Sequence, residues 1–275
     1  MTRARVLLVE DDASIRRYVG LALEDLPVDL VEAGTLEEAR QALAGGAFAL
    51  LLTDLMLPDG SGLDLLARLQ ADPALRGGAR VVVLSAGVST AVRGQASALG
   101  AWRVLEKPVS LAALTECVAQ ALDQPAARPA PPATARAPAP LLRDVRAAAI
   151  DAHFGGQAAL YDAFRASSLA QFLADIDAGD AACRDGDVAV LRRQAHNLKS
   201  ALLLLGADAA SARARTLEAA AASGTAAITA LAPLWHDLRC AVLLLRRGAE
   251  TLTRACPQPS TRIEKPKKSG TVTRQ

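Results

Sequence analysis

The first 123 residues alternate between short apolar runs and longer segments in which apolar residues recur every three or four positions. The short runs predict strands over residues 6–9, 28–31, 48–53, 81–85 and 104–105. The longer segments predict helices over residues 14–25, 35–45, 62–71, 88–99 and 110–122. Strands that are apolar throughout are typical of a parallel sheet with helices on both faces. The pattern therefore predicts a doubly wound α/β domain with a five-stranded parallel sheet.

Residues 142–253 follow a different pattern, with helical periodicity throughout and Pro233 as the one proline. Helices are predicted over residues 142–153, 157–185, 187–205, 208–223 and 226–253, with glycine at most of the breaks between them. Successive helices joined by short breaks pack most readily as antiparallel neighbours. The second half of the chain is therefore predicted to be an all-α antiparallel helical bundle.

A proline-rich segment separates the two patterns. Six of the 14 prolines fall between residues 125 and 140, where they remove backbone donors and favour extended conformations. Residues 124–141 are therefore predicted to be a linker between a domain at 1–123 and a domain at 142–253. Residues 254–275 contain six Lys or Arg, one acid and few apolar residues, which predicts a disordered basic tail.

Composition restricts the function classes. The net charge is +2, and the surplus of basic residues lies in the predicted tail. The sequence shows no helix-turn-helix with a basic recognition helix outside the bundle, so we expect no nucleic-acid partner. Four cysteines lie far apart without metal-ligand or pairing spacing, as in a reducing compartment. With no signal-peptide core and no run of about 20 apolar residues, we expect a cytoplasmic protein outside the membrane.

Polar side chains stand where the predicted strands end. These residues are Glu10, Asp11, Asp12, Asp54, Ser85 and Lys107. The carboxyl ends of parallel strands meet at one crevice, so these groups are expected to converge there. Converging carboxylates need a hard divalent cation such as Mg²⁺, and that cation would let one carboxylate attack phosphorus by screening the repulsion between anions. Lys107 and Ser85 would then hold phosphoryl oxygens.

This set resembles the receiver domain of two-component response regulators, which has the flavodoxin-like fold. The likeness covers the acidic cluster, Asp54 with the following residues 55–60, Ser85-Ala86 and Lys107-Pro108, and Asp54 precedes Ser85 by 31 residues and Lys107 by 53. The resemblance implies that Asp54 is the phosphoacceptor and that Glu10, Asp11 and the carbonyl of Met56 surround Mg²⁺. It also implies a cis Lys107–Pro108 bond. Asp12 stays open as a metal ligand, because the cluster has three acids for two family positions.

The sequence departs from that family three residues before the lysine. An aromatic residue is usual at this position, whereas this chain has Val104 there and Trp102 two residues earlier. The aromatic residue normally packs inward when the hydroxyl moves to the phosphoryl group. We therefore expect a weaker or differently connected conformational output.

His196 lies on the helix predicted over residues 187–205. At about 100° per residue, an apolar stripe forms on one side of this helix from Leu191, Ala195, Leu198, Leu202 and Leu205. His196 points away from that stripe, so we expect it on the solvent-exposed face, near Arg192 and Lys199. Neighbouring cations disfavour imidazolium and hence predict a neutral, nucleophilic imidazole; they can also hold a phosphoryl group. Ser200 is small and leaves room for an incoming domain.

The helical part resembles the histidine-containing phosphotransfer (HPt) domain over about residues 150–250. The matching residues are His196-Asn197-Leu198-Lys199-Ser200, Leu205-Gly206-Ala207 and Leu217-Glu218. Ser200 replaces the commoner glycine. The resemblance implies that His196 carries a phosphoryl group, with Lys199 beside it. His153 and His236 lack these companions and are interpreted as ordinary surface histidines.

Together the two likenesses predict a phosphorelay protein that moves a phosphoryl group between His196 and Asp54. A sensor or hybrid histidine kinase would supply the group, and a downstream response regulator would receive it. We find no ATP-binding kinase domain, so whether the chain counts as an enzyme is a matter of definition. The alternative is a regulator whose helical part only docks or dimerises; the sequence leaves its oligomeric state open.

Overall fold

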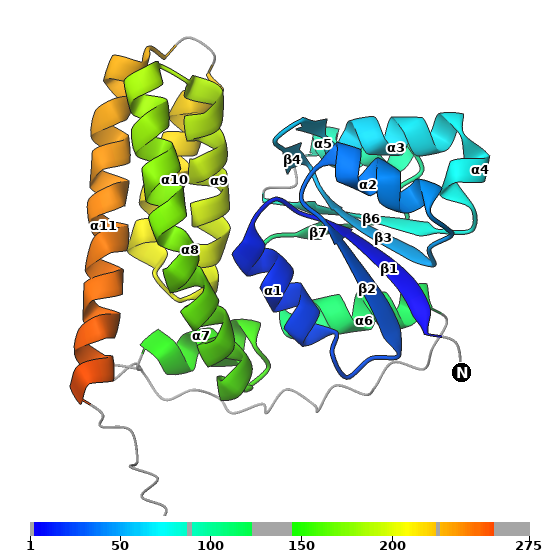
Figure 1. The fold of residues 1–275 in the computed structure, drawn as a ribbon, viewed down its shortest axis with the longest axis horizontal. Helices are drawn as coiled ribbons and strands as arrows, with labels where there is room; N and C mark the ends of the chain where they lie inside the picture. The colour runs from blue at the N-terminus through cyan, green and yellow to red at the C-terminus, as the bar shows by residue number, and fades with distance from the viewer. Residues whose placement is uncertain (1–2, 87–89, 123–144, 224–225, 256–275) are drawn as a thin grey trace, which may run out of the picture.

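The computed structural model describes residues 3–86, 90–122, 145–223 and 226–255. An α/β part and a bundle of long helices lie side by side (Figure 1). The predicted linker at 124–141, the tail beyond residue 255 and Cys256 lie outside the described residues. The other three cysteines, Cys117, Cys183 and Cys240, are free thiols, as expected.

The α/β part contains the predicted five-stranded parallel sheet. Its strands, in the spatial order β2-β1-β3-β6-β7, are β1 Ala4–Val9, β2 Val28–Ala33, β3 Leu50–Asp54, β6 Arg80–Ser85 and β7 Arg103–Glu106. Neighbouring strands are parallel throughout, with Val9 of β1 opposite Thr53 of β3. This register brings the residues that follow β1 next to the end of β3. The predicted fold class is confirmed.

Helices cover both faces of this sheet (Figure 1). Helices α1 Ala13–Ala22 and α6 Leu111–Ala121 pack on one face, and α2 Leu36–Ala44, α3 Gly62–Ala71 and α5 Thr90–Ala98 pack on the other. Alternate strand residues serve the two layers: Leu50 and Leu52 join the α1–α6 core, while Leu51 joins the opposite one. Burial on both faces explains why these strands are apolar at successive positions.

Two short elements beyond the predicted ones follow β3 and α3. A hairpin, β4 Met56–Leu57 with β5 Gly60–Ser61, comes directly after Asp54, and α4 spans Pro73–Arg76. In the hairpin turn, the Asp59 carboxylate accepts hydrogen bonds from the backbone N–H groups of Leu36 and Glu37, 2.8 and 3.0 Å away. Asp59 therefore caps α2 and holds the loop beside the end of β3.

The second half of the chain forms the predicted helical bundle. Its helices are α7 Val145–His153, α8 Ala158–Asp185, α9 Val188–Leu204, α10 Asp208–Ala222 and α11 Ile228–Ala255. The predicted apolar stripe of α9 is buried from Leu191 to Leu205. Gly186 and Gly206 end α8 and α9 at a φ of 75° each, a left-handed conformation that glycine adopts without a steric penalty.

The prediction that no segment is apolar enough to span a membrane is not met by α11. The segment Ile228–Gly248 of α11 is long and apolar enough to cross a membrane by length and composition, with a mean hydropathy of 1.4. Charged residues such as Asp237 and Arg239 interrupt the apolar run of this segment. Leu231, Trp235 and Leu238 on one side of α11 are buried in the bundle. This stripe shows that the helix packs on its neighbours through one face.

Replacing Gly179 by alanine is expected to destabilise the bundle. A Cβ at this position of α8 would lie 2.1 Å from the indole of Trp235 on α11, and crowding of a packed core costs roughly 1–3 kcal/mol. Gly94→Ala is the matched control, since a Cβ on that helical glycine meets nothing within 4 Å and should stabilise by about 0.5–1 kcal/mol. Calorimetric unfolding of both variants measures this, and an unchanged melting temperature for Gly179→Ala would contradict the packing.

The two halves share one hydrophobic cluster through aromatic side chains. Tyr18 of α1 contacts Phe154 and Phe164 edge to face, with ring centroids 5.4 and 5.8 Å apart. Its hydroxyl donates a hydrogen bond to the carbonyl of Val109, 3.0 Å away. Edge-to-face aromatic pairs add stabilisation beyond their buried area. This contact docks α1 against α8 and brings the carboxyl ends of the strands toward the bundle.

Candidate functional site

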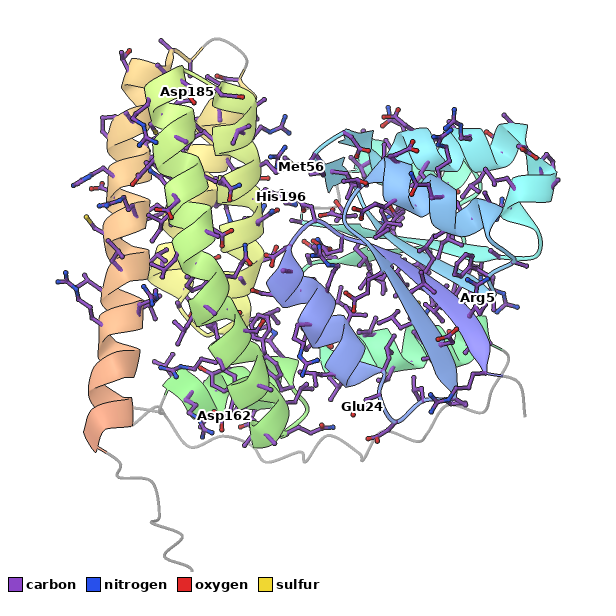
Figure 2. The ribbon with its side chains drawn as sticks, in the orientation of Figure 1. Arg5, Glu24, Met56, Asp162, Asp185 and His196 are labelled. Carbon is purple, nitrogen blue, oxygen red and sulfur yellow. The ribbon has the colours of Figure 1, made fainter. Side chains whose placement is uncertain are left out.

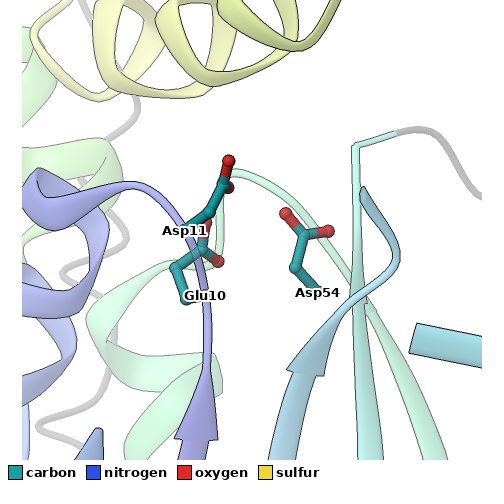
Figure 3. Close-up of side chains that lie close together, drawn as sticks. All are labelled: Glu10, Asp11 and Asp54. Carbon is teal, nitrogen blue, oxygen red and sulfur yellow. The ribbon is translucent and has the colours of Figure 1, made fainter. Parts of the chain in front are cut away.

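Three carboxylates gather at the carboxyl end of the sheet. Glu10 and Asp11 directly follow β1, and Asp54 is the last residue of β3, which the register places alongside. Their oxygens lie within 4.8 Å of one another, and Asp54 is completely buried. Figure 3 shows the three groups close together at the strand ends, below a helix of the bundle. The structure thus brings together three of the acids selected from the sequence.

Lys107 lies between these acids. Its Nζ donates to Glu10 Oε2 at 2.6 Å and to Asp54 Oδ2 at 2.7 Å. Burial alone would lower the pKa of Lys107, but the two carboxylates raise it, so the ammonium stays charged. Burial would raise the pKa of Asp54, but Lys107 and His196 hold it below its usual range. The Lys107–Pro108 bond is cis, as the receiver likeness implied.

Asp12 has a different environment from its two neighbours. Its carboxylate accepts hydrogen bonds from the backbone N–H groups of Ser14 and Ile15, at 2.7 and 3.2 Å, and so caps α1. Burial raises the pKa of Asp12 to about 6, although these backbone donors oppose the shift. It lies outside the cluster of three carboxylates. We assign it the capping role.

The remaining receiver-type residues surround Asp54. The backbone N–H groups of Leu55 and Met56 donate to Asp54 Oδ1 at 2.5 and 3.3 Å, which fixes the carboxylate at the strand end. Ser85 ends β6 and is buried, and its carbonyl accepts a hydrogen bond from the backbone N–H of Lys107 at 2.8 Å. The strand ends therefore bring Ser85, Lys107 and Asp54 to one place.

The donor set fits a hard divalent cation. Glu10 Oε1 and Asp11 Oδ1 are buried and have no hydrogen-bond partner among the described residues. Burial raises the pKa of both acids. Lys107 offsets part of this rise for Glu10, and the hydrogen bond from Asn197 offsets part of it for Asp11. Carboxylate oxygens are the ligands that Mg²⁺ prefers. A cation held by Glu10, Asp11 and Asp54 would stabilise the ionised acids and bind the oxygens that lack partners.

His196 of α9 faces this cluster from the bundle. Its Nε2 lies 3.8 Å from Asp54 Oδ2, and only 5% of the residue is exposed. Figure 2 shows His196 on the side of the bundle that faces the sheet. The predicted solvent exposure of His196 is wrong, because the α/β part covers the helix face opposite the apolar stripe. Helical periodicity correctly separated the two faces but gave no information about this second contact.

Glu218 of α10 orients the imidazole. Its Oε1 lies 2.6 Å from His196 Nδ1, and its Oε2 accepts a hydrogen bond from Lys199 Nζ. A carboxylate beside Nδ1 favours a proton on that nitrogen and turns Nε2 toward Asp54. Burial would raise the pKa of Glu218, but His196 and Lys199 lower it, so this carboxylate stays ionised.

The predicted direction of the His196 pKa shift is also wrong. Burial would lower the pKa of His196, but the carboxylates of Asp54 and Glu218 raise it above its ordinary value. That prediction rests on Arg192 and Lys199 alone, which lie on the same helix. The decisive acids come from β3 and α10. Lys199, meanwhile, is paired with Glu218 and is less able to repel an imidazolium.

Lys199 and Ser200 also contact the α/β part. Lys199 Nζ donates to the carbonyl of Ala86, 3.3 Å away. Ser200 is buried, and it lines one small cavity together with Lys107 and Pro108. The room predicted beside Ser200 thus faces residues that follow β7.

Two further bundle residues contact the acidic cluster. Asn197 Nδ2 donates to Asp11 Oδ2 at 3.1 Å, and Arg193 Nε lies 3.6 Å from the same oxygen. Neither residue is among the site residues predicted from the sequence. Both lie on the face of α9 that carries His196, and helical periodicity is enough to predict this position. The periodicity does not predict which residues of the receiver part they contact.

Comparison with known proteins supports the assignment of the α/β part. Residues 6–119 match the family described as response regulator receiver domain. The response regulator protein PilR of Pseudomonas aeruginosa is 39% identical over 122 residues, 44% of this chain and 27% of PilR. The response regulator receiver protein CpdR of Brucella abortus is 31% identical over 108 residues, 39% of this chain and 87% of CpdR. The chain belongs to the response regulator receiver family.

The receiver domain spans under half of the chain, which in turn covers about a quarter of PilR. A crystal structure of the signal receiver domain of a putative LuxO repressor protein from Vibrio parahaemolyticus is 31% identical, with a TM-score of 0.41 over 44% of this chain and 91% of that one. Membership places the chain in two-component signalling. Receiver domains bind Mg²⁺ at an acidic pocket, and the carboxylates of Glu10, Asp11 and Asp54 form one here.

Phosphorylation of the receiver domain is expected to change Trp102 fluorescence only slightly. Trp102 precedes β7 at the end of the sheet opposite Asp54, and the guanidinium carbons of Arg80 and Arg103 lie 5.0 and 4.7 Å from the centre of its ring. Val104 occupies the position of the usual inward-moving aromatic residue. Because Trp235 also fluoresces, the emission is measured in a Trp235→Phe variant before and after phosphorylation. A large change in the emission of this variant would contradict the prediction.

Proposed function

We propose that the chain is a phosphorelay protein in which Asp54 of the receiver domain and His196 of the bundle exchange a phosphoryl group. The observation that carries this proposal is the 3.8 Å separation of His196 Nε2 and Asp54 Oδ2 within one chain. Phosphorus bonded to Nε2 would lie between the two atoms, which would then move apart until the attacking oxygen lies roughly 3–3.5 Å from phosphorus. The bundle is accordingly proposed to be an HPt domain.

In the transfer from histidine, Asp54 Oδ2 attacks the phosphorus while the bond from phosphorus to His196 Nε2 breaks. The electron pair of that bond returns to Nε2, and the reverse step follows the same line. Glu218 keeps the other ring nitrogen protonated, so that Nε2 stays aligned. Lys107 and Lys199 lie where they can neutralise the phosphoryl oxygens. Bound Mg²⁺, held by Glu10, Asp11 and Asp54, would supply further charge neutralisation.

Exchange with other proteins requires the two halves to separate. Both phosphoryl-carrying atoms are buried where the halves meet, since Asp54 is fully covered and His196 nearly so. We propose a sensor or hybrid histidine kinase as the source of the phosphoryl group and a downstream response regulator as its acceptor, in the cytoplasm. The proline-rich segment between residues 122 and 145 would keep the separated halves at a high effective concentration.

The experiment that tests the proposal is ³¹P NMR of the full chain treated with phosphoramidate and Mg²⁺. We expect two signals, from an acid-labile phosphohistidine and a base-labile acyl phosphate. An acyl phosphate alone, under conditions that preserve phosphohistidine, would leave the alternative function: a receiver-controlled regulator whose helical domain only docks or dimerises.

Glu218→Ala is expected to slow transfer between Asp54 and His196 by about 10–100-fold, because the ring loses the partner that fixes its tautomer and direction. Glu218→Gln is the matched variant: it keeps a hydrogen-bonding side chain of the same length and should recover part of the rate. Rapid-quench measurement of the two phosphorylated forms gives the rates. Equal rates for Glu218→Ala and the unmodified chain would contradict the orienting role.

A further inference from the structure

Four buried side-chain oxygens at the domain contact have no hydrogen-bond partner among the described residues. They are Glu10 Oε1 and Asp11 Oδ1 of the receiver domain and Gln194 Oε1 and Asn197 Oδ1 of the bundle. A buried polar atom without a partner is costly, and several near one another indicate a missing ligand. The first two belong to the acidic cluster already described. The other two come from α9, and of these Asn197, one residue beyond His196, makes a hydrogen bond to that cluster.

The Asn197 side chain lies within reach of that cluster. Its Nδ2 donates to Asp11 Oδ2 at 3.1 Å, so the amide already lies against one of the carboxylates. The oxygen and nitrogen of an asparagine amide have nearly the same shape, and half a turn about the last side-chain bond exchanges them. After this turn the amide oxygen would occupy the place of the nitrogen. Amide carbonyl oxygens are, like carboxylates, hard ligands for divalent cations.

We propose that Asn197 supplies an oxygen ligand from the bundle to the divalent cation held by Glu10, Asp11 and Asp54. The cation would then bridge the two domains. This inference rests on the docked arrangement used for the proposed function, but it concerns cation binding and requires no phosphoryl transfer. Arg193, 3.6 Å from Asp11 Oδ2, would yield that oxygen to the cation.

Bridging makes cation binding and domain docking mutually dependent. A ligand that contacts both halves binds the docked state more tightly, so docking raises its affinity and the cation strengthens docking by the same factor. Loss of the cation would favour separated domains, in which His196 is accessible to partners. Occupancy of the site would thus select between exchange within the chain and exchange with other proteins.

The first test is calorimetric titration of Mg²⁺ into the unphosphorylated full chain. Asn197→Ala is expected to weaken binding about tenfold, as loss of a supporting ligand does. Asn197→Asp keeps an oxygen and should bind Mg²⁺ at least as tightly as the unmodified chain. Gln95→Ala is the control: it removes an exposed amide from α5 and should leave the affinity unchanged. Unchanged binding by Asn197→Ala, or equal weakening by Gln95→Ala, would overturn the proposal.

The second test uses the fact that Asn197 is the one asparagine in the sequence. Asparagine labelled with ¹³C at its side-chain carbonyl therefore marks a single amide in the whole chain. With Mn²⁺ in place of Mg²⁺, electron–nuclear double resonance should detect a strong ¹³C coupling from a directly bound amide. Only a weak through-space coupling would refute ligation. Because no phosphoryl group is present, this result is independent of whether His196 and Asp54 exchange one.

Discussion

Replacement of His196 by glutamine is expected to leave acyl phosphate on Asp54 as the sole phosphorylated form and to abolish histidine–aspartate transfer. The imidazole nitrogen is the only group that we place opposite Asp54 as a phosphoryl carrier, so the rate should fall at least about a thousandfold. Asp54 keeps Lys107, Glu10 and Asp11 and should still accept a phosphoryl group from phosphoramidate. Separation of acid-labile from base-labile label after rapid quenching distinguishes the two forms.

The matched control for this variant is His236→Gln. His236 is an exposed histidine on α11, whose ring contacts Cys240, so its loss should leave both phosphorylated forms in place. The reciprocal variant, Asp54→Asn, should keep the phosphohistidine and lose the acyl phosphate. If His196→Gln still gave acid-labile, base-stable label, the histidine carrier would be another residue and the assignment would fall.

The second large effect is expected from Ser200→Trp. Ser200 is buried and lines a small cavity with Lys107 and Pro108 of the receiver domain, and an indole at this position would hold the two halves apart. A displacement of an ångström at the reacting atoms can cost about 100-fold in rate, and we expect at least this loss in transfer within the chain. Phosphorylation of Asp54 by phosphoramidate should persist, since the receiver residues around it are unchanged.

Thr216→Trp is the control for Ser200→Trp. Thr216 is an exposed residue of α10, so the same large side chain there should leave transfer unchanged. Circular dichroism of both variants is the check that they fold. Transfer at the unmodified rate in a folded Ser200→Trp chain would show that the docked arrangement is not the one that reacts.

Much of the receiver site could be predicted from the sequence, for a physical reason. Parallel strands end at one edge of a sheet, so a residue that ends a strand is placed by the fold itself. Asp54 and Lys107 are 53 residues apart in the chain and 2.7 Å apart in the structure because each marks a strand end. Asp12 is the exception within the cluster: its carboxylate turns back onto the first turn of α1 as a cap.

The bundle side was only half predictable. Helical periodicity correctly placed Leu198 in the core and His196 on the opposite face of α9, but it does not report what covers that face. The contacts of His196 with Asp54 and Glu218, and of Asn197 with Asp11, depend on how α9 meets α10 and the receiver domain. The erroneous pKa direction had the same origin, because the deciding charges lie on other elements.

The measurement that tests the account most directly is the concentration dependence of transfer. The full chain is phosphorylated on His196 with phosphoramidate in the absence of Mg²⁺ and freed of the donor; Mg²⁺ then starts transfer to Asp54. Exchange within one chain predicts that the first-order rate constant stays the same over about a hundredfold range of protein concentration, since the docked domains supply the acceptor. A rate that rises in proportion to concentration, or no acyl phosphate at all, would contradict it.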